Sequence, residues 1–387
     1  MYGWGDILVK RNIISQAFWL ENRKKIEDWV SEYFEKYNKS SHSCRPLIYS
    51  SIDMRNSGFK LAHVDANAFP AGFNNIHPNR LVSVKENFTK YLKKHANDPK
   101  KILLISEEFT RNISYLKNID ALREILSSDG RDCRVGMINK NLTRKADYIY
   151  LDGWKPDFIV LNSDLSAGFP ELLKGVSQDI VPPPSMGWHS RSKYNHFNSF
   201  QIIIDEFCKE FSLDPWLLST FYRLSSNINF RQKEGLEDIA SKVEDVISRI
   251  RLKYDEYDIK DTPYVFIKAD KGTFGAGIMT AFSRDDIMNI NKKARHSMNT
   301  INHGLNNGEV LIQEGVPTYF KEGGPSENVY YNIAGVPTFK IVRHNPMKDS
   351  ISNLNSSGMQ MIPDEDIGYS DEWVISMIAS LAMMFEN

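Results

Sequence analysis

The chain has 387 residues, of which 41% are hydrophobic and 25% are charged, a composition that is typical of folded proteins and excludes extensive disorder. Lys and Arg total 48 and Asp and Glu total 49, so the formal net charge of −1 excludes a general electrostatic field for nucleic acid or an anionic membrane. The three cysteines (Cys44, Cys133 and Cys208) are widely spaced and odd in number, which argues against a disulfide framework and a zinc site.

The N-terminal residues lack the basic start and apolar core of a secretory signal, and no apolar run reaches the roughly 18 residues that a membrane span needs. We therefore expect a cytoplasmic protein that binds small molecules rather than nucleic acid or a membrane. The length predicts two domains. A run of three prolines at residues 182–184 cannot continue a helix or a central strand, so we place the boundary there, with domains at residues 1–186 and 187–387.

The first half predicts an α/β domain. After a long opening helix over residues 14–37, short apolar runs alternate with helical patterns, which favours a doubly wound, mostly parallel sheet. The predicted strands cover residues 46–52, 61–64, 101–106, 133–139 and 158–161, and the predicted helices between them include residues 82–94 and 119–126.

The second half predicts an α+β region. Two helices, over residues 194–211 and 236–253, flank a break at Asp214-Pro215, and a strand over residues 264–268 follows. Residues 328–343 are typical of a hairpin that turns at Ala334-Gly335, and a helix over residues 371–386 ends the chain.

Polar residues follow several predicted strands of the first half. Ligands of doubly wound sheets bind beyond the carboxyl ends of the strands, so these residues are candidate substrate contacts. The alternative for the Asx residues is ordinary turn formation, and for Arg111 it is an ion pair with Glu107 or Glu108. The candidates are Asp65, Asn67, Asn74, Asn75, Thr110, Arg111, Asn112, Asn162 and Asp164.

The segment over residues 264–279 combines a strand that ends in Lys268 with a glycine-rich loop. Glycines let backbone amides approach anionic oxygens, and the lysine adds a charge, so the pattern predicts a phosphate-binding loop formed by Lys268, Gly272, Thr273, Gly275 and Gly277. The spacing is not that of a Walker loop, and a glycine-rich hairpin is the alternative.

Two segments downstream support a nucleotide site. Gln313, Glu314 and Val316 end an apolar strand and suit a hinge that binds adenine. The predicted hairpin delivers Arg343 to the same region, and a loop that carries Asn353 and Asn355 follows.

The order of these parts resembles the ATP-grasp superfamily over about half of the chain, with Lys193 and Lys268 matching its two lysines by context. More narrowly, the sequence resembles the proteobacterial, ATP-grasp-like type of glutamate–cysteine ligase nearly end to end. The motifs that carry this resemblance lie at residues 64–75, 108–112, 162–166, 187–197 and 268–279, and the fourth includes Arg191.

The resemblance implies an N-terminal amino-acid-binding domain and an ATP-grasp-like C-terminal half that use ATP and Mg²⁺ to join glutamate and cysteine through an acyl phosphate, releasing ADP and phosphate. Lys268 and Arg343 would act in catalysis, Asp65 would bind an ammonium group and Arg111 a carboxylate. The chain departs from the superfamily in lacking a terminal Glu-x-Asn metal pair, which leaves Glu327, Asn353 and Asn355 as metal candidates. Another ATP-grasp ligase and a non-catalytic nucleotide-binding module are the alternatives.

Overall fold

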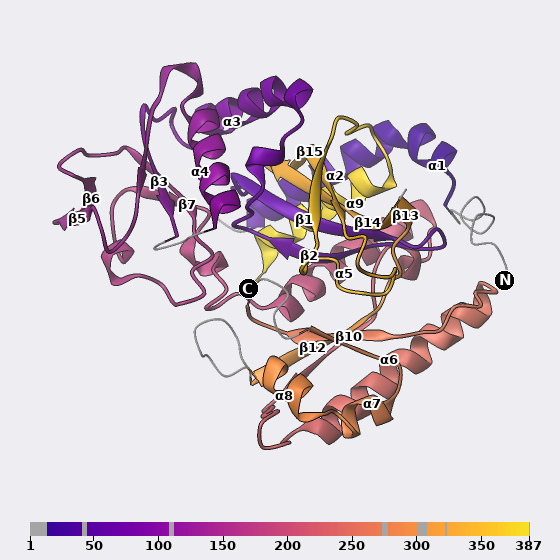
Figure 1. The fold of residues 1–387 in the computed structure, drawn as a ribbon. Helices are drawn as coiled ribbons and strands as arrows, with labels where there is room; N and C mark the ends of the chain where they lie inside the picture. The colour runs from indigo at the N-terminus through magenta and orange to yellow at the C-terminus, as the bar shows by residue number, and fades with distance from the viewer. Residues whose placement is uncertain are drawn as a thin grey trace.

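The computed structural model describes residues 14–40, 45–107, 112–272, 278–299, 308–321 and 323–386. Within them the chain forms three main sheets with helices packed around them (Figure 1). The helices are α1 (Gln16–Glu21), α2 (Arg23–Ser40), α3 (Leu81–His95), α4 (Ile113–Leu126), α5 (Lys193–Phe211), α6 (Leu236–Glu256), α7 (Arg284–Met288), α8 (Lys292–Asn299) and α9 (Asp371–Ala382).

The largest sheet is antiparallel and combines strands from both ends of the chain. Its order is β16-β15-β14-β1-β2, and β13 pairs with β14 beside this path. Ser51 on β1 pairs with Tyr331 on β14, so the sheet crosses the expected domain boundary at residue 186. The bounds are β1 (Tyr49–Asn56), β2 (Leu61–Asn67), β13 (Phe320–Lys321), β14 (Gly324–Ile333), β15 (Val336–His344) and β16 (Gln360–Asp364).

A parallel sheet of order β4-β3-β7-β8 forms the part of the first half that follows the doubly wound prediction. Its strands are β3 (Lys101–Ser106), β4 (Asp132–Gly136), β7 (Phe158–Asn162) and β8 (Asp179–Val181), and a hairpin of β5 (Leu142–Lys145) and β6 (Tyr148–Leu151) projects beside it (Figure 1). The predicted strands at residues 46–52 and 61–64 do not join this sheet, which corrects the expectation. Both strands are largely buried, and buried parallel and antiparallel strands share the same apolar pattern.

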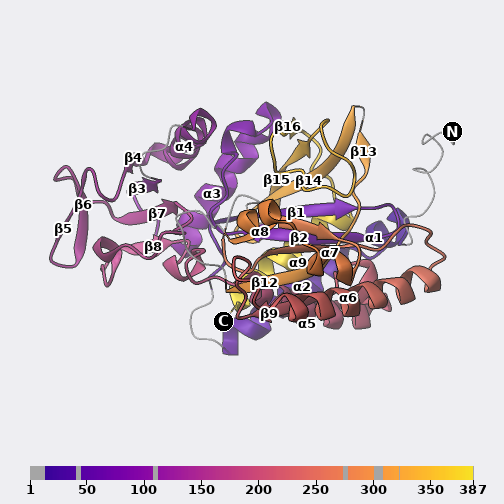
Figure 2. The same ribbon diagram turned by 60° about the horizontal axis from the view of Figure 1, so that its bottom comes forward.

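The third sheet is antiparallel, with the order β11-β10-β12-β9. Its strands are β9 (Tyr222–Ser226), β10 (Val265–Ala269), β11 (Ile278–Ala281) and β12 (Glu309–Glu314). Helix α6 packs on β9, β10 and β12, and the views in Figures 1 and 2 show α6 and α7 on the outer side of this sheet. Buried residues recur along α6 at helical spacing, which explains why the charged sequence forms a helix there.

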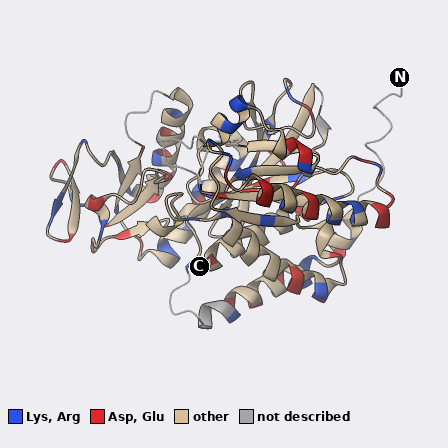
Figure 3. Ribbon diagram, turned by 90° about the horizontal axis from the view of Figure 1, so that it is seen from below, with Lys and Arg blue, Asp and Glu red and all other residues tan. Residues whose placement is uncertain are grey.

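Two hydrophobic cores hold the layers together. One lies where the large sheet meets α3, α4 and the parallel sheet, with Phe73, Phe88 and Tyr331 among its largest side chains. The other extends from α2 and α5 to α6 and α9. Basic and acidic residues are interspersed over the described parts of the ribbon (Figure 3), in agreement with the near-zero net charge. No described helix combines the length and the apolar character that a membrane crossing requires.

Helix α9 joins the large sheet through polar as well as apolar contacts. Asn328 Nδ2 donates to Glu372 Oε2 at 2.5 Å, Asn332 Nδ2 donates to Ser376 Oγ at 3.0 Å, and the hydroxyls of Ser50 and Ser380 lie 2.9 Å apart. Glu372, Ser376 and Ser380 are four residues apart, so one helix face carries all three contacts. Burial and the neighbouring Asp371 raise the pKa of Glu372 to about 7.

We predict that Glu372→Gln stabilises the protein above neutral pH. The folded state holds the Glu372 proton at a higher pH than the unfolded state, whose pKa is near the ordinary 4.5, so the wild type loses stability as pH rises from about 4.5 to about 7. The amide keeps an acceptor for Asn328 without this cost. Urea unfolding at a series of pH values should show a gain of about 1 to 3 kcal/mol above pH 7 that disappears below the unfolded-state pKa.

Glu32→Gln, on the exposed face of α2, is the matched control and should show no such pH-dependent gain. A Glu372→Gln variant that is less stable than the wild type at every pH would mean that the buried carboxylate is fully compensated by its neighbours.

Candidate active site

A cavity of about 570 Å³ lies where the three sheets meet. Most of the described residues that the sequence predicted as site residues line it, although they come from both halves of the chain. These are Asp65, Asn67, Asn74, Asn75, Asn112, Asp164, Lys193, Lys268, Gly272, Glu327, Arg343, Asn353 and Asn355. Thr110, Arg111, Thr273, Gly275 and Gly277 lie outside the described residues.

Strand β2 is an edge strand of the large sheet and binds three cationic side chains from the second half of the chain. Lys268 Nζ donates to Val64 O at 2.6 Å, Lys193 Nζ lies 3.1 Å from Asp65 Oδ1, and Arg191 donates to Ala66 O. An edge strand leaves alternate backbone carbonyls unpaired, so Val64 and Ala66 can accept from side chains on the same side. β2 therefore positions the two predicted phosphate-binding lysines.

Burial and charge change the protonation of this lysine cluster. Burial and the nearby Lys193 lower the pKa of Lys268 to about 8, although Asp65 opposes the shift. Burial alone would raise the pKa of Asp65, but Lys193 and Lys268 outweigh it and hold this pKa below its usual range. Asp65 thus balances the charge of the two lysines. The sequence predicted that Asp65 binds the ammonium group of a substrate, but in the structure its carboxylate is already paired with Lys193.

A network of alternating charges occupies another wall of the cavity. Arg343 donates to Glu327 Oε1 at 2.5 Å and to Asp53 Oδ2 at 2.6 Å, and Arg55 Nε donates to Glu327 Oε2 at 2.9 Å. Burial alone would raise the pKa of Glu327, but Arg55 and Arg343 lower it. Asp53 and Arg55 were not predicted as site residues. The sequence signal that could have identified them is a pair of opposite charges within a largely buried strand.

A buried chain of hydrogen bonds begins at His63 on β2. His63 Nε2 lies 2.9 Å from His196 Nε2, and His196 Nδ1 lies 2.7 Å from Glu386 Oε1, while Arg191 forms an ion pair with the same carboxylate. Burial lowers the pKa of both histidines, well below the ordinary value for His63. Arg191 was predicted to bind substrate, but its side chain is buried among these hydrogen-bonded residues and does not line the cavity.

Asn162 and the three predicted hinge residues, Gln313, Glu314 and Val316, also lie away from the cavity lining. Asn162 is buried and bonds to Asn118, Pro70 and Tyr49, so it holds the cavity wall in place. Gln313 donates to Thr220 Oγ1 at 2.9 Å, and Glu314 forms a buried ion pair with Lys60 at 2.6 Å.

The predicted hinge segment uses its backbone within the protein. The amide of Glu314 donates to Phe221 O at 2.8 Å, and Val316 O accepts from Arg55 at 3.2 Å. The lining of the cavity therefore gives no support to adenine contacts from Gln313, Glu314 or Val316.

The cavity has donors and acceptors that suit ATP and a divalent cation. Lys193, Lys268 and Arg343 provide positive charge for phosphate oxygens, and Gly272 has φ +124°, a conformation that favours glycine. Carboxylates and side-chain amides are the oxygen ligands that Mg²⁺ prefers, and Asp53, Glu327, Asn353 and Asn355 provide them.

The carboxylates of this set are already engaged. Both oxygens of Glu327 accept from arginine, and the described part of the chain places no group of three or more His, Cys, Asp or Glu side chains around a metal position. A bound Mg²⁺ would accordingly take most of its ligands from phosphates and water.

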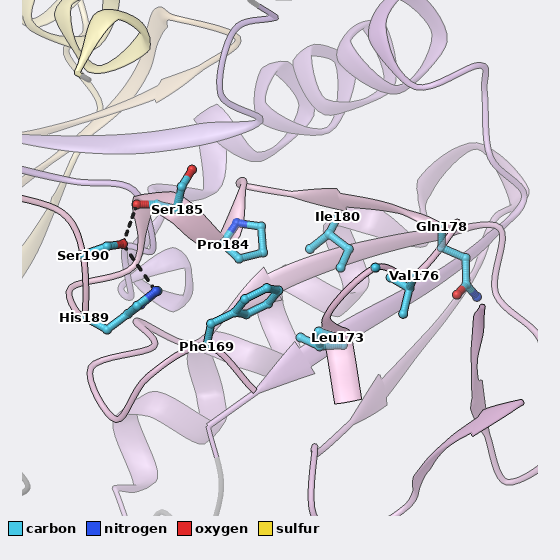
Figure 4. A pocket seen from close by; sticks show the side chains of 10 residues that line it. Phe169, Leu173, Val176, Gln178, Ile180, Pro184, Ser185, His189 and Ser190 are labelled. Atoms are coloured by element: carbon cyan, nitrogen blue, oxygen red, sulfur yellow. Dashed lines mark hydrogen bonds between the residues drawn. The ribbon is translucent and has the colours of Figure 1, made fainter. Parts of the chain in front are cut away.

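A second pocket, of about 520 Å³, is bounded by the turn that brings Trp188 to the main cavity (Figure 4). Its lining is largely apolar, with Phe169, Leu173 and Ile180 facing His189 and Ser190. Ser190 donates to Ser185 O at 2.9 Å, and burial lowers the pKa of His189. None of the described lining residues is Lys or Arg, so this pocket offers no countercharge for a triphosphate.

A model of the glutamate–cysteine ligase family matches residues 16–147 and 139–368 of this chain. The crystal structure of a candidate gamma-glutamylcysteine synthetase from Methylobacillus flagellatus is similar to it, with a TM-score of 0.86 and 33% identity over 95% of this chain and 94% of that chain. A search of curated protein sequences gives no match.

Two more distant structures also align. A glutathione synthetase-like effector from Globodera pallida gives a TM-score of 0.38 and 11% identity over 85% of this chain and 76% of that chain. A D-cycloserine synthetase gives 0.41 and 12% over 73% of this chain and 80% of that chain.

We predict that Lys268→Ala weakens ATP binding while the fold is retained. The loss of a charge-assisted contact costs about 1.5 to 3 kcal/mol, which is roughly tenfold to 10²-fold in affinity. In the wild type, ATP affinity should also fall as pH rises through about 8, where free Lys268 loses its proton. Isothermal titration with ATP, together with thermal unfolding, measures both effects.

Lys271→Ala is the control, because this neighbouring lysine is 44% exposed and lies 3.7 Å from Glu309. Equal ATP affinity in the wild type and a folded Lys268→Ala variant would remove Lys268 from the phosphate site.

Proposed function

Because this chain belongs to the glutamate–cysteine ligase family and is an ATP-dependent carboxylate–amine ligase, we propose that it joins the γ-carboxyl group of L-glutamate to the amine of L-cysteine. The observation that carries this proposal is the cavity itself. Lys193, Lys268 and Arg343 line it together with amide and carboxyl side chains, so one site provides contacts for phosphates and for an amino acid.

The reaction has to overcome the poor reactivity of a carboxylate toward an amine. Transfer of the γ-phosphoryl group of ATP to the γ-carboxylate of glutamate gives an acyl phosphate, whose phosphate is a good leaving group. The amine of cysteine then forms the amide, and ADP and phosphate are released. Phosphoryl transfer depends on alignment and charge neutralisation more than on covalent help from the protein.

The described residues suit these tasks. We assign Lys193 and Lys268 to the phosphate oxygens, with β2 fixing their positions through Asp65 and Val64. We assign Arg343 to the charge that develops on the transferred group, because Asp53 and Glu327 orient its guanidinium. Mg²⁺ would add further neutralisation of the phosphates.

The amino-acid contacts come from the loops of the first half. Asn67 ends β2, Asn74 and Asn75 follow it, and all three line the cavity; Asn112 lines it at the start of α4. These amides can accept from ammonium groups and donate to carboxylates, as recognition of an amino acid requires. Arg111 remains our candidate for the α-carboxylate from the sequence alone.

We predict that hydroxylamine traps the activated acid. With glutamate, ATP and Mg²⁺ but no cysteine, the enzyme should form γ-glutamyl hydroxamate and an equal amount of ADP, because a small nucleophile can attack an acyl phosphate. Mass spectrometry of the hydroxamate and a coupled ADP assay provide the two readouts, and reactions that lack glutamate provide the control.

Formation of γ-glutamylcysteine with AMP and pyrophosphate would refute the acyl phosphate but keep the substrates. If glutamate yields no product with any amine, while another acid does, the chain is a carboxylate–amine ligase of different specificity.

A further inference from the structure

The carboxyl groups that line the cavity fall into two classes. Asp53 and Glu327 pair with Arg343, and Asp65 pairs with Lys193. Glu107 and Asp164 line the same cavity, but no described cation lies within ion-pair distance of either. The sequence did not identify them as a pair: Asp164 was a candidate substrate contact, and Glu107 was considered only as an ion-pair partner of Arg111.

The parallel sheet brings these two carboxyl groups together. Ser106, the last residue of β3, pairs with Asn162, the last residue of β7, so Glu107 and Asp164 follow adjacent strand ends by one and two residues. Tyr115 on α4 ties the ends together, because its hydroxyl accepts from the Glu107 amide at 2.9 Å and donates to Asn162 O at 2.5 Å. Carboxyl ends of parallel strands are where such sheets bind ligands.

Asp164 is held in place by backbone hydrogen bonds that leave one of its carboxylate oxygens free to accept from a ligand. One carboxylate oxygen, Oδ1, accepts from the Ser166 amide at 2.9 Å, and the Trp188 amide donates to Asp164 O at 2.9 Å, which fixes the residue. The other oxygen, Oδ2, is buried and has no hydrogen-bond partner among the described residues, and the residue is only 8% exposed. A buried carboxylate oxygen without a donor is costly, so a donor from a bound molecule would relieve this cost.

The electrostatic surroundings favour a cationic ligand that can give up a proton. Burial and the negative charge of Asp164 raise the pKa of Glu107 to about 7. The other charged groups that line the cavity are Asp53, Arg55, Asp65, Lys193, Lys268, Glu327 and Arg343. All seven take part in described ion pairs or hydrogen bonds with one another or with backbone groups of other elements.

We infer that Glu107 and Asp164 bind the ammonium group of the incoming amine, and that Glu107 accepts its proton so that the amine can attack. Asp164 gives the buried oxygen that holds the ammonium N–H, and Glu107 is the catalytic base. This inference rests on the proposed ligase function and adds the acceptor site to it.

The proposed step balances in charge and atoms. One N–H bond of the cysteine ammonium breaks, its electron pair stays on nitrogen, and the proton passes to the Glu107 carboxylate. The nitrogen lone pair then forms the C–N bond with the carbonyl carbon of the acyl phosphate, which is the Cδ atom of glutamate. The C–O bond to phosphate breaks, phosphate leaves with that electron pair, and it takes up the second N–H proton as the amide forms.

The test compares two nucleophiles in Glu107→Gln. Cysteine carries an ammonium that must be deprotonated, whereas hydroxylamine is a weaker base and is already neutral near pH 7. We expect Glu107→Gln to lower kcat with cysteine by about 10²-fold and to remove the rise of activity with pH through about 7. The rate of γ-glutamyl hydroxamate formation should stay near the wild-type rate.

Asp164→Asn gives a second, independent readout. Loss of the neighbouring negative charge should lower the pKa of Glu107, so the rising limb of the pH–rate profile with cysteine should move to lower pH, with a higher KM for cysteine. Glu86→Gln, at an exposed position on α3, is the matched control. Thermal unfolding checks that each variant is folded.

The outcomes separate this inference from the proposed function. A wild type that makes neither γ-glutamylcysteine nor the hydroxamate would refute the ligase proposal itself. If the wild type makes both but Glu107→Gln keeps the cysteine rate and its pH dependence, the assignment of the base is wrong. If Glu107→Gln slows both nucleophiles equally and raises the KM for glutamate, the pair binds the donor amino acid, and the acceptor site lies elsewhere.

Discussion

The attachment of three cations to the free edge of β2 is the contact on which the rest of the site depends. Val64 O binds Lys268, Asp65 binds Lys193 and Ala66 O binds Arg191, so three consecutive residues hold side chains from the strand β10, from the first residue of α5 and from the turn just before it. These contacts bring the small antiparallel sheet and α5 against the large sheet. The cavity exists between these layers because their cations are held at the outer edge of β2, where the backbone carbonyls have no strand partner.

Charge balance within the cavity follows from this arrangement. Lysines and arginines that are buried beside one another repel. Asp65 is the acidic partner of Lys193, and Asp53 and Glu327 are the partners of Arg343, whereas Lys268 donates to the carbonyl of Val64. A triphosphate that enters the cavity would add negative charge beside these cations, so no further cationic side chain would have to move into the site. The buried chain of hydrogen bonds from Glu386 through His196 to His63 also holds β2, which gives Glu386 a part in the geometry of the site.

The sequence predicted most elements and many of the cavity residues, because these depend on local signals. Apolar runs marked β3, β7 and β10, and glycine with lysine marked the predicted phosphate loop. Long-range pairing had no local signal: β1 and β14 are separated by more than half of the chain, yet Ser51 pairs with Tyr331. For the same reason Arg191 was interpreted as a substrate contact, although Glu386 lies far along the sequence and binds it in the fold. Glu107 was considered only as a partner for Arg111, since its proximity to Asp164 depends on the register of two parallel strands.

A crystal structure with glutamate, Mg²⁺ and an ATP analogue that cannot transfer its γ-phosphate tests the proposed phosphate site most directly. We expect the γ-phosphate to lie between Lys193, Lys268 and Arg343, and the γ-carboxylate of glutamate to face it inside the same cavity. A nucleotide bound outside this cavity, or a glutamate whose γ-carboxylate lies away from the phosphate, would contradict this proposal.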